Sequence, residues 1–489
     1  MNKVPRLVNC GVELRPDHQR VITRFFVAGH EDVGPGASRA NAVIDRLLSL
    51  TPEQVQTAVH DVDVRFGERH SGLHDTFEEH AARVCALYGV LPDLSPMQRR
   101  LLGASFTHEY SIEGAALCNP SAVLHPIQNI PGAARFMLSV RGIGEGHFSS
   151  IGFREGMVTA DGQVSIQPAR PDLQTGVTTA IGRSVSGLRE LLERHLADKD
   201  TPGVSELSLD GIEHTDLELL IEQRLALAGI TLNAHELASM MNVLGQSQYQ
   251  VVFDPNSDVS ERVLWPHLPL ESHGMEDARF VRFVNDDSSV TFFGTYTGFD
   301  GNSVCQQLLQ TDDFVTFQAS SIRGPAAADK GFALFPRKIN GNYAALSRAD
   351  RETNSVSVSR DLTFWTDATP IHTPSLPWEI IQVGNCGSPI ETDKGWLVLT
   401  HGVGPMRTYS LGAMLLDLDE PQRVISQTQV PVLTPSIEGR NGYVPNVVYS
   451  CGGFVYEGRL VVPYGVSDQT ISVSTVDLDE LLASLTESR

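Results

Sequence analysis

The spacing of apolar residues divides the chain into a helical N-terminal part and a longer part made of short strands. Apolar residues recur every three or four positions from Ala40 to Leu48 and again from His80 to Tyr88, which is the period of an amphipathic helix. The segment 49–53 between them has the composition of a helix end followed by a new helix start. The pattern predicts an N-terminal helical extension over residues 1–107.

From His108 onward the pattern changes to short strands separated by polar turns. Residues 119–126 and 134–142 are predicted to form two strands joined by a loop that contains Pro and Gly. A second stretch of helical period, at about residues 184–246, interrupts this region and is predicted to be an insertion at its rim. The residues from 478 to 489 are predicted to form a C-terminal helix.

Between about Gln248 and Thr475 a unit of two strands and a polar turn recurs. The turns fall at residues 285–289, 340–342, 393–395 and 457–458. The motifs Asp313-Phe314-x-x-Phe317 and Asp361-Leu362-x-x-Trp365 each follow a predicted strand and lie 48 residues apart. A period of roughly 40 to 60 residues with several strands per unit is typical of a β-propeller.

Counting the unit at residues 119–141 gives five blades within residues 108–477. A β-sandwich or a β-helix is the alternative, but sandwiches rarely repeat one turn-and-aromatic unit so often, and β-helix repeats are shorter. The predicted fold is therefore an all-β five-bladed β-propeller with an N-terminal α-helical extension and a helical insertion.

Composition restricts the class of partner. The 489 residues are 41% hydrophobic and 20% charged, as in an ordinary globular protein large enough for more than one core. There are 37 basic and 59 acidic residues, so the net charge is −22. This charge argues against nucleic acid or an anionic membrane as a partner, while a local basic pocket could still hold a small anion.

Cysteine usage and the N-terminus point to a cytoplasmic protein without a metal. The six cysteines lack the spacing of a zinc site or of a disulfide framework, and the first residues lack an apolar leader segment. The histidines at 60, 70, 74 and 80, together with Glu79, also lack a metal-ligand spacing. We expect no metal and no cofactor.

The segment Glu276-Asp277-Ala278-Arg279 is the strongest candidate for chemistry. It lies between Gly274 and an alternating apolar strand, so that charge is placed where the chain enters a packed sheet. A carboxylate there can act as an acid on a bound substrate. The alternative is a structural ion pair between Asp277 and Arg279.

The propeller prediction favours a catalytic role, because the inner strands of all blades direct one end at a shared funnel. Polar residues recur at these predicted strand ends. They are Asn119, Arg141, Asp277, Lys330, Arg348, His401 and Asp468.

Six motifs in this order make the family recognisable. They are Glu276-Asp277-x-Arg279, the segment from Lys330 through Arg348, Gly395 through Val403, Tyr409 through Asp417, Val444 through Val448, and Tyr464-Gly465-x-x-Asp468. Together they resemble glycoside hydrolase family 130, whose members are β-mannoside phosphorylases and β-1,2-mannosidases on a five-bladed β-propeller. The resemblance runs from about residue 108 to the C-terminus, except for the helical insertion.

The resemblance implies a role for each candidate residue. Asp277 would be the catalytic general acid. The substrate-binding residues would be Asn119, Arg141, Glu276, Arg279, Tyr464 and Asp468, and the phosphate-binding residues would be Lys330, Arg348, His401 and Tyr409. Inorganic phosphate would be a co-substrate, a manno-oligosaccharide the other ligand, and a homodimer the possible assembly.

The implied reaction is inverting phosphorolysis of a β-mannoside, with β-1,2-linked manno-oligosaccharides preferred, to give α-mannose 1-phosphate. Phosphate is already an ionised nucleophile, so this glycosyltransferase-type reaction needs one carboxylic acid and a cationic clamp in place of a second carboxylate. The chain departs from most phosphorylases of the family by having Lys330 in place of an arginine and Gln382 in place of a lysine. A hydrolase, an inverting β-1,2-mannosidase with Glu271, Glu276 or Glu379 as base, is the alternative, and a non-catalytic glycan-binding propeller is a third.

Overall fold

The computed structural model describes residues 5–27, 39–70, 72–88, 93–182 and 248–487. These residues form two compact units. The described residues within 17–114 and 170–174 belong to the smaller unit, and the other described residues belong to the larger. The predicted helical insertion at about 184–246 lies outside the described residues.

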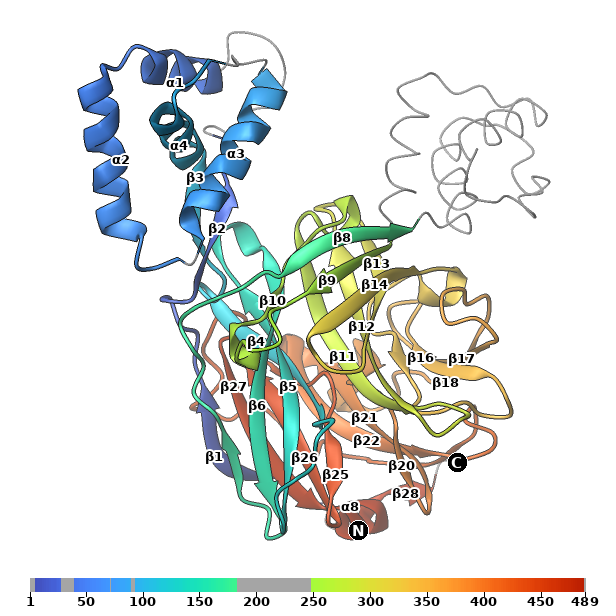
Figure 1. The fold of residues 1–489 in the computed structure, drawn as a ribbon. Coiled ribbons are helices and arrows are strands. Elements are labelled where there is room, and N and C mark those ends of the chain that lie inside the picture. Colours follow the sequence, from blue (N-terminus) through green and yellow to red (C-terminus); the bar gives the residue numbers. More distant parts are fainter. Residues whose placement is uncertain (1–4, 28–38, 71, 89–92, 183–247, 488–489) are drawn as a thin grey trace, which may run out of the picture. The chain divides into compact units, whose positions relative to one another are not determined.

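The smaller unit is a group of helices with a two-stranded sheet (Figure 1). Its elements are α1 (Arg39–Leu48), α2 (Pro52–Phe66), α3 (Leu73–Tyr88) and α4 (Pro96–Ser105), with β2 (Val21–Phe25) paired to β3 (Thr107–Ser111). Thr51 and Gln54 form a capping box that starts α2, as do Ser95 and Gln98 for α4. The predicted helix end and new start at residues 49–53 is therefore confirmed.

The larger unit consists of antiparallel strands. The largest sheet contains β4 (Ala116–Leu124), β5 (Ala133–Ile143), β6 (Ser149–Thr159), β7 (Val164–Ile166), β10 (Val263–Leu264), β11 (Gly274–Val284), β12 (Val290–Phe299), β13 (Val304–Thr311), β14 (Thr316–Ile322), β9 (Gln248–Val252) and β8 (Val177–Gly182). A single parallel pair, Gly274 with Ser149, joins β11 to β6. The sheet is thus two antiparallel groups that this one strand pairing joins.

Three further sheets complete the larger unit. The first contains β15 (Ala333–Leu334), β16 (Tyr343–Ser347), β17 (Asn354–Ser359) and β18 (Ala368–His372). The second contains β19 (Gln382–Asn385), β20 (Ile390–Thr392), β21 (Gly395–Gly404), β22 (Thr408–Leu416), β23 (Val424–Gln427) and β28 (Thr486–Glu487). The third contains β24 (Val448–Tyr449), β25 (Phe454–Tyr456), β26 (Arg459–Val466), β27 (Thr470–Asp477) and, at its edge, β1 (Val8–Leu14).

The predicted turns are confirmed. Residues 285–289 connect β11 to β12, residues 340–342 precede β16, residues 393–394 connect β20 to β21, and residues 457–458 connect β25 to β26. The two aromatic motifs also follow strands, since β13 ends at Thr311 and β17 ends at Ser359. Mostly-β architecture is therefore correct for the larger unit.

Two boundaries predicted from sequence were wrong. The helical extension over residues 1–107 does not describe Val8–Leu14 or Val21–Phe25, which are strands, and β1 pairs with β27 of the larger unit. The C-terminal helix, α8, covers Leu478–Ser484, and the chain then forms β28 against β23. Val8–Leu14 alternates between apolar and polar residues, so this strand had a sequence signal that the prediction missed, whereas the two residues of β28 are too few to show alternation.

Six free cysteines are present, and three of them are buried. No helix among the described residues is both long and apolar enough to cross a membrane.

Candidate active site

Asp277 and Asn119 occupy irregular positions of two strands in the largest sheet. The pairing of β11 with β12 shifts between Glu276 and Arg279, and the pairing of β4 with β5 shifts between Cys118 and Ser121. Asp277 has φ 56° and Asn119 has φ 47°. A bulge turns a side chain away from the regular alternation, and left-handed backbone at such residues is a strain found at functional sites.

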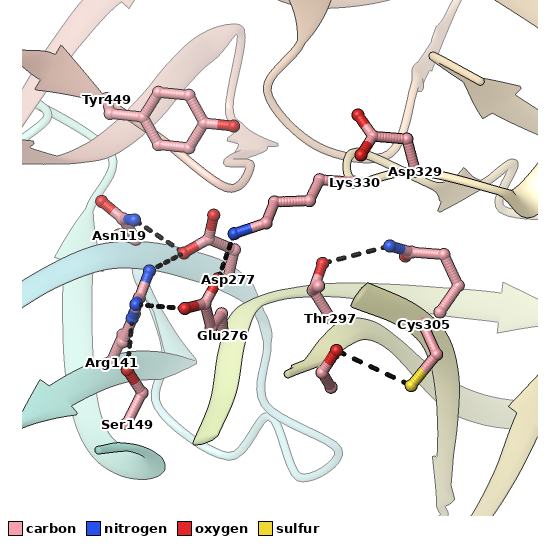
Figure 2. A network of polar contacts seen from close by, with 12 residues as sticks. Asn119, Arg141, Ser149, Glu276, Asp277, Thr297, Cys305, Asp329, Lys330 and Tyr449 are labelled. Atoms are coloured by element: carbon pink, nitrogen blue, oxygen red, sulfur yellow. Dashed lines mark hydrogen bonds and ion pairs between the residues drawn. The ribbon is translucent and has the colours of Figure 1, made fainter. Parts of the chain in front are cut away.

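These two bulges bring the Asp277 carboxylate against two donors (Figure 2). Asn119 Nδ2 donates to Asp277 Oδ1 at 2.7 Å, and Arg141 Nη1 donates to the same oxygen at 2.9 Å. Arg141 comes from β5, where its Nε also donates to Ser149 Oγ at 2.9 Å. Three strands therefore fix the position of one carboxylate.

Glu276 extends this network to Lys330. Arg141 Nη2 donates to Glu276 Oε1 at 2.7 Å, and Lys330 Nζ pairs with Glu276 Oε2. The side chains of Arg141 and Glu276 are 15% and 10% exposed, whereas that of Lys330 is 36% exposed. Lys330 is therefore the member of this network with the most access to solvent (Figure 2).

The network keeps Asp277 ionised in the absence of ligand. Burial acts to raise the pKa of this carboxyl, but the charges of Arg141, Arg279 and Lys330 and the hydrogen bond from Asn119 outweigh it and hold the pKa far below its usual range. A general acid must carry a proton, so Asp277 has to gain one before it can act in that role.

Arg279, for which the resemblance implies substrate binding, is enclosed by groups of the protein itself. It is 1% exposed, and its donors go to Asp277 O at 2.8 Å, Cys386 O at 2.9 Å and Tyr449 OH at 2.9 Å. The guanidinium donates to the backbone of Asp277 and also connects it to Tyr449 in a second sheet. Arg279 is thus a positioning residue.

Sequence reasoning missed Tyr449, the partner of Arg279. Its ring contacts the rings of His401 and Tyr409, with centroid distances of 4.9 Å and 6.2 Å. The signal was its place directly after the Val444–Val448 motif.

Three of the predicted phosphate-binding residues lie together. Arg348 Nη1 donates to His401 Nε2 at 3.2 Å, and the rings of His401 and Tyr409 stack at 6.1 Å. Burial and the neighbouring Arg348 hold the pKa of His401 well below its usual range, so the imidazole is neutral. Arg348 Nε is buried without a hydrogen-bond partner among the described residues, which leaves a donor at this group.

Lys330 reaches the same region from the loop before β15. A Cβ placed on Gly331 would lie 3.9 Å from Arg348 Cβ, and Asn385 Nδ2 donates to Gly331 O at 2.9 Å. Asp329, which the sequence analysis did not select, lies 3.9 Å from Arg348 Nη2. The two cations predicted for phosphate, Lys330 and Arg348, therefore approach from adjacent segments, although Lys330 pairs with Glu276.

Asp468 also belongs to this site. It follows β26 with φ 46° and is close enough to Arg141 and Asp277 for their charges to act on it. Burial raises the pKa of Asp468 to about 6 against the lowering effect of Arg141.

Tyr464, for which the resemblance implies substrate binding, is held by neighbouring strands of its sheet. It is 5% exposed in the middle of β26, and its hydroxyl accepts from Asn9 Nδ2 at 3.4 Å and from Ser474 Oγ at 3.3 Å. These partners lie on β1 and β27, so Tyr464 is part of the sheet's own packing.

Two of the three glutamates considered as a hydrolytic base are held by structure. Glu271 accepts from the backbone amides of His267 and Leu268 and from two tyrosine hydroxyls. Glu379 accepts from the backbone amides of Ser375 and Leu376. Both are 1% exposed or less. Each closes a short 3₁₀ turn before a strand, at Pro269–Glu271 and Pro377–Glu379.

Within the described residues, no group of three or more His, Cys, Asp or Glu side chains could hold a metal ion. His70 and His74, which had been weighed as ligands, instead pair with Glu109 and Asp63.

Comparison with known proteins places this arrangement in a family. The family described as beta-1,4-mannooligosaccharide phosphorylase matches residues 250–487. A 1,2-beta-oligomannan phosphorylase of Thermoanaerobacter sp. (strain X514) is 34% identical over 219 residues, which cover 43% of this chain and 71% of that protein. A beta-1,2-mannobiose phosphorylase of the same organism is 33% identical over 225 residues, covering 45% and 72%.

Among solved structures, the beta-1,2-mannobiose phosphorylase of Listeria innocua in complex with beta-1,2-mannobiose aligns with 77% of this chain and 93% of its own, at 21% identity and a TM-score of 0.46. The sequence relatives, each covered over more than two thirds of its length, confirm the resemblance found in the motifs. The chain belongs to glycoside hydrolase family 130.

Proposed function

We propose that this protein is an inverting glycoside phosphorylase that cleaves β-mannosides with inorganic phosphate and releases α-mannose 1-phosphate. The observation that carries the proposal is that the Asp277 carboxylate lies in a hydrogen-bond network that extends to Lys330, near Arg348. Glu271 and Glu379, in contrast, are held by hydrogen bonds within turns. One acid and one anion-binding group are what inverting phosphorolysis requires.

In the proposed mechanism Asp277, once protonated, is the source of the proton that reaches the leaving oxygen as the glycosidic bond breaks. A phosphate oxygen held by Arg348, His401 and Lys330 forms the new bond to the anomeric carbon from the opposite face of the sugar. Asn119 Oδ1, which is buried without a hydrogen-bond partner among the described residues, and Asp468 would accept sugar hydroxyls.

The hydrolase alternative needs a carboxylate that activates water. Of the three candidates only Glu276 reaches the network around Asp277, and both of its oxygens are engaged by cations. A carboxylate whose two oxygens already accept from two cations is not free to accept a proton from water, which favours phosphate as the nucleophile. Phosphate is the co-substrate in this proposal.

A β-1,2 linkage is proposed for the substrate. The two relatives at 34% and 33% identity, and one from Listeria innocua at 30%, are named for β-1,2-linked mannosides, whereas one from Ruminococcus albus at 32% is named for a β-1,4 linkage. We also propose that the larger unit is a five-bladed propeller. This is supported by its three separate sheets and by the single pair that joins the two halves of the largest.

The test is to incubate the protein with β-1,2-mannobiose in the presence and absence of phosphate. Mannose 1-phosphate should form only with phosphate, and β-1,4-mannobiose should react more slowly. Asp277→Asn should lower kcat by about a hundredfold or more while ligand still binds. Release of free mannose at the same rate with and without phosphate would establish the hydrolase instead.

A further inference from the structure

The resting site contains a row of alternating charges that the proposed reaction has to break. The order is Lys330, Glu276, Arg141 and Asp277, and each neighbouring pair is in hydrogen-bond contact. Glu276 uses one oxygen for each cation, so it is the link between the solvent-accessible ammonium and the buried arginine. Removing Lys330 from this row would leave Glu276 with Arg141 alone.

Phosphate and Glu276 require the same ammonium group. Lys330 is a flexible point charge with partial exposure, whereas Arg348 is fixed by His401 and Asp329. A phosphate dianion beside Arg348 would attract Lys330 more strongly than one half of an already paired carboxylate does.

We propose that Glu276 is a positioning residue that competes with phosphate for Lys330, so that arrival of the nucleophile transfers Lys330 from Glu276 to phosphate and allows Asp277 to take up a proton. The inference rests on the phosphorylase function proposed above.

The charges around Asp277 determine the direction of this coupling. The charged neighbours of Asp277 come from four parts of the chain: Arg141 from β5, Arg279 and Glu276 from β11, Lys330 from the loop before β15, and Asp468 from the turn after β26. His401 is a neutral neighbour. Burial raises the pKa values of three further neighbours, Cys118, Cys451 and Tyr449. A bound dianion cancels the charge of Lys330 and adds negative charge, and both changes favour the protonated form of Asp277.

The proposed reaction takes up and releases equal numbers of protons. Asp277 takes a proton from solvent when phosphate binds, and this proton goes to the leaving oxygen as that oxygen loses its bond to the anomeric carbon. The phosphate oxygen donates the electron pair of the new bond, and the hydrogen of HPO₄²⁻ leaves to solvent from the product monoester. Asp277 ends as the carboxylate.

A double-mutant cycle tests the competition, with phosphate affinity measured by titration calorimetry at constant ionic strength. Glu276→Gln should tighten phosphate binding by about threefold to tenfold, because Lys330 no longer has a competing partner. The same change in a Lys330→Met background should leave the affinity unchanged within about twofold. Equal tightening in both backgrounds would reduce the effect to general charge repulsion, and weaker binding would make Glu276 a structural residue; either overturns the proposal.

Proton uptake is a second readout, obtained by repeating the phosphate titration in two buffers of different ionisation enthalpy. Free phosphate titrates identically with every variant, so the difference between wild type and Asp277→Asn isolates the carboxyl. Wild type should take up more protons per phosphate, by a fraction of one up to about one. Equal uptake would overturn the coupling, whereas Glu276→Asp, which keeps the charge, should retain it.

These outcomes separate the inference from the function on which it rests. If cleavage depends on phosphate but the double-mutant cycle shows no coupling between Glu276 and Lys330, the role proposed for Glu276 is wrong and the phosphorylase function stands. Phosphate-independent release of mannose, or no phosphate binding by wild type, would remove both.

Discussion

At the scale of single residues, the site depends on polar side chains held in left-handed backbone. Asn119, Asp277 and Asp468 have φ values of 47°, 56° and 46°. Asn and Asp tolerate this region better than other residues with a side chain, yet each such residue costs of order ~1 kcal/mol. The motifs named these three residues, but a motif carries no information on backbone angles or on the partners that Arg279 contacts.

Arg279 offers a direct test of positioning. Arg279→Lys keeps the charge but cannot reach Asp277 O, Cys386 O and Tyr449 OH together, so we expect a loss of about 2–4 kcal/mol of stability and at least a tenfold lower kcat. Arg282→Lys is the matched control, because Arg282 lies on the same strand and is exposed. It should change stability by less than about 0.5 kcal/mol. Chemical denaturation and steady-state kinetics measure both; equal effects of the two changes would remove the assigned role.

Asp468 should make stability depend on pH in the direction opposite to most carboxyls. Its folded pKa of about 6 exceeds the ordinary value of 3.8, so the folded state binds more protons between these values and stability falls as pH rises from about 4 to 6. Asp468→Asn removes this loss, which amounts to about 3 kcal/mol at most. The melting temperature of the variant should therefore rise relative to wild type between pH 4.5 and pH 7.5. A difference that stays constant across this range would contradict the raised pKa.

At the scale of elements, turns were predictable and glycine packing was not. Polar turns such as Asn285–Ser289 have a local signal, because side chains of Asp and Asn bond their own backbone. By contrast, Gly156 on β6 faces Phe136 on β5, and Gly294 on β12 faces Phe280 on β11. A cross-strand pair joins residues that are distant in sequence, so its partners cannot be read from either strand alone.

The pair on β5 and β6 gives an element-scale prediction. A Cβ at Gly156 would lie 2.1 Å from the ring of Phe136, which is buried, whereas a Cβ at Gly152 on the same strand would lie at an ordinary 3.5 Å from Val140. Gly156→Ala should destabilise the protein by about 1–3 kcal/mol through overpacking. Gly152→Ala should be within about 1 kcal/mol of wild type. The melting temperatures of the two variants test this difference in stability. Equal melting temperatures would mean that the ring of Phe136 moves aside without loss of stability.

At the scale of the whole chain, the feature that sequence reasoning could not supply is the pairing of its two ends. β1 lies along β27, and Ser472 Oγ donates to Val12 O across 460 positions of sequence (Figure 1). The residues of β1 alternate between apolar and polar apart from one glycine, but nothing local identifies the strand with which β1 pairs. The repeats predicted the sheets between the two ends of the chain. The pairing of β1 with β27 depends on tertiary contacts between residues distant in sequence.

Removing β1 should therefore weaken a sheet formed by the opposite end of the chain. Deletion of residues 1–14 would expose the outer edge of β27, remove Asn9 from Tyr464 and Ser472, and uncover the core packed under Val12 and Leu14. We expect the melting temperature to fall by about 5 °C or more, with greater aggregation. Deletion of residues 1–6, which stops before the strand, should leave both unchanged. Because Asp468 lies in the turn between β26 and β27, the longer deletion should also raise KM for the mannoside more than KM for phosphate, and an unaltered KM for both would show that β26 and β27 hold their turn without β1.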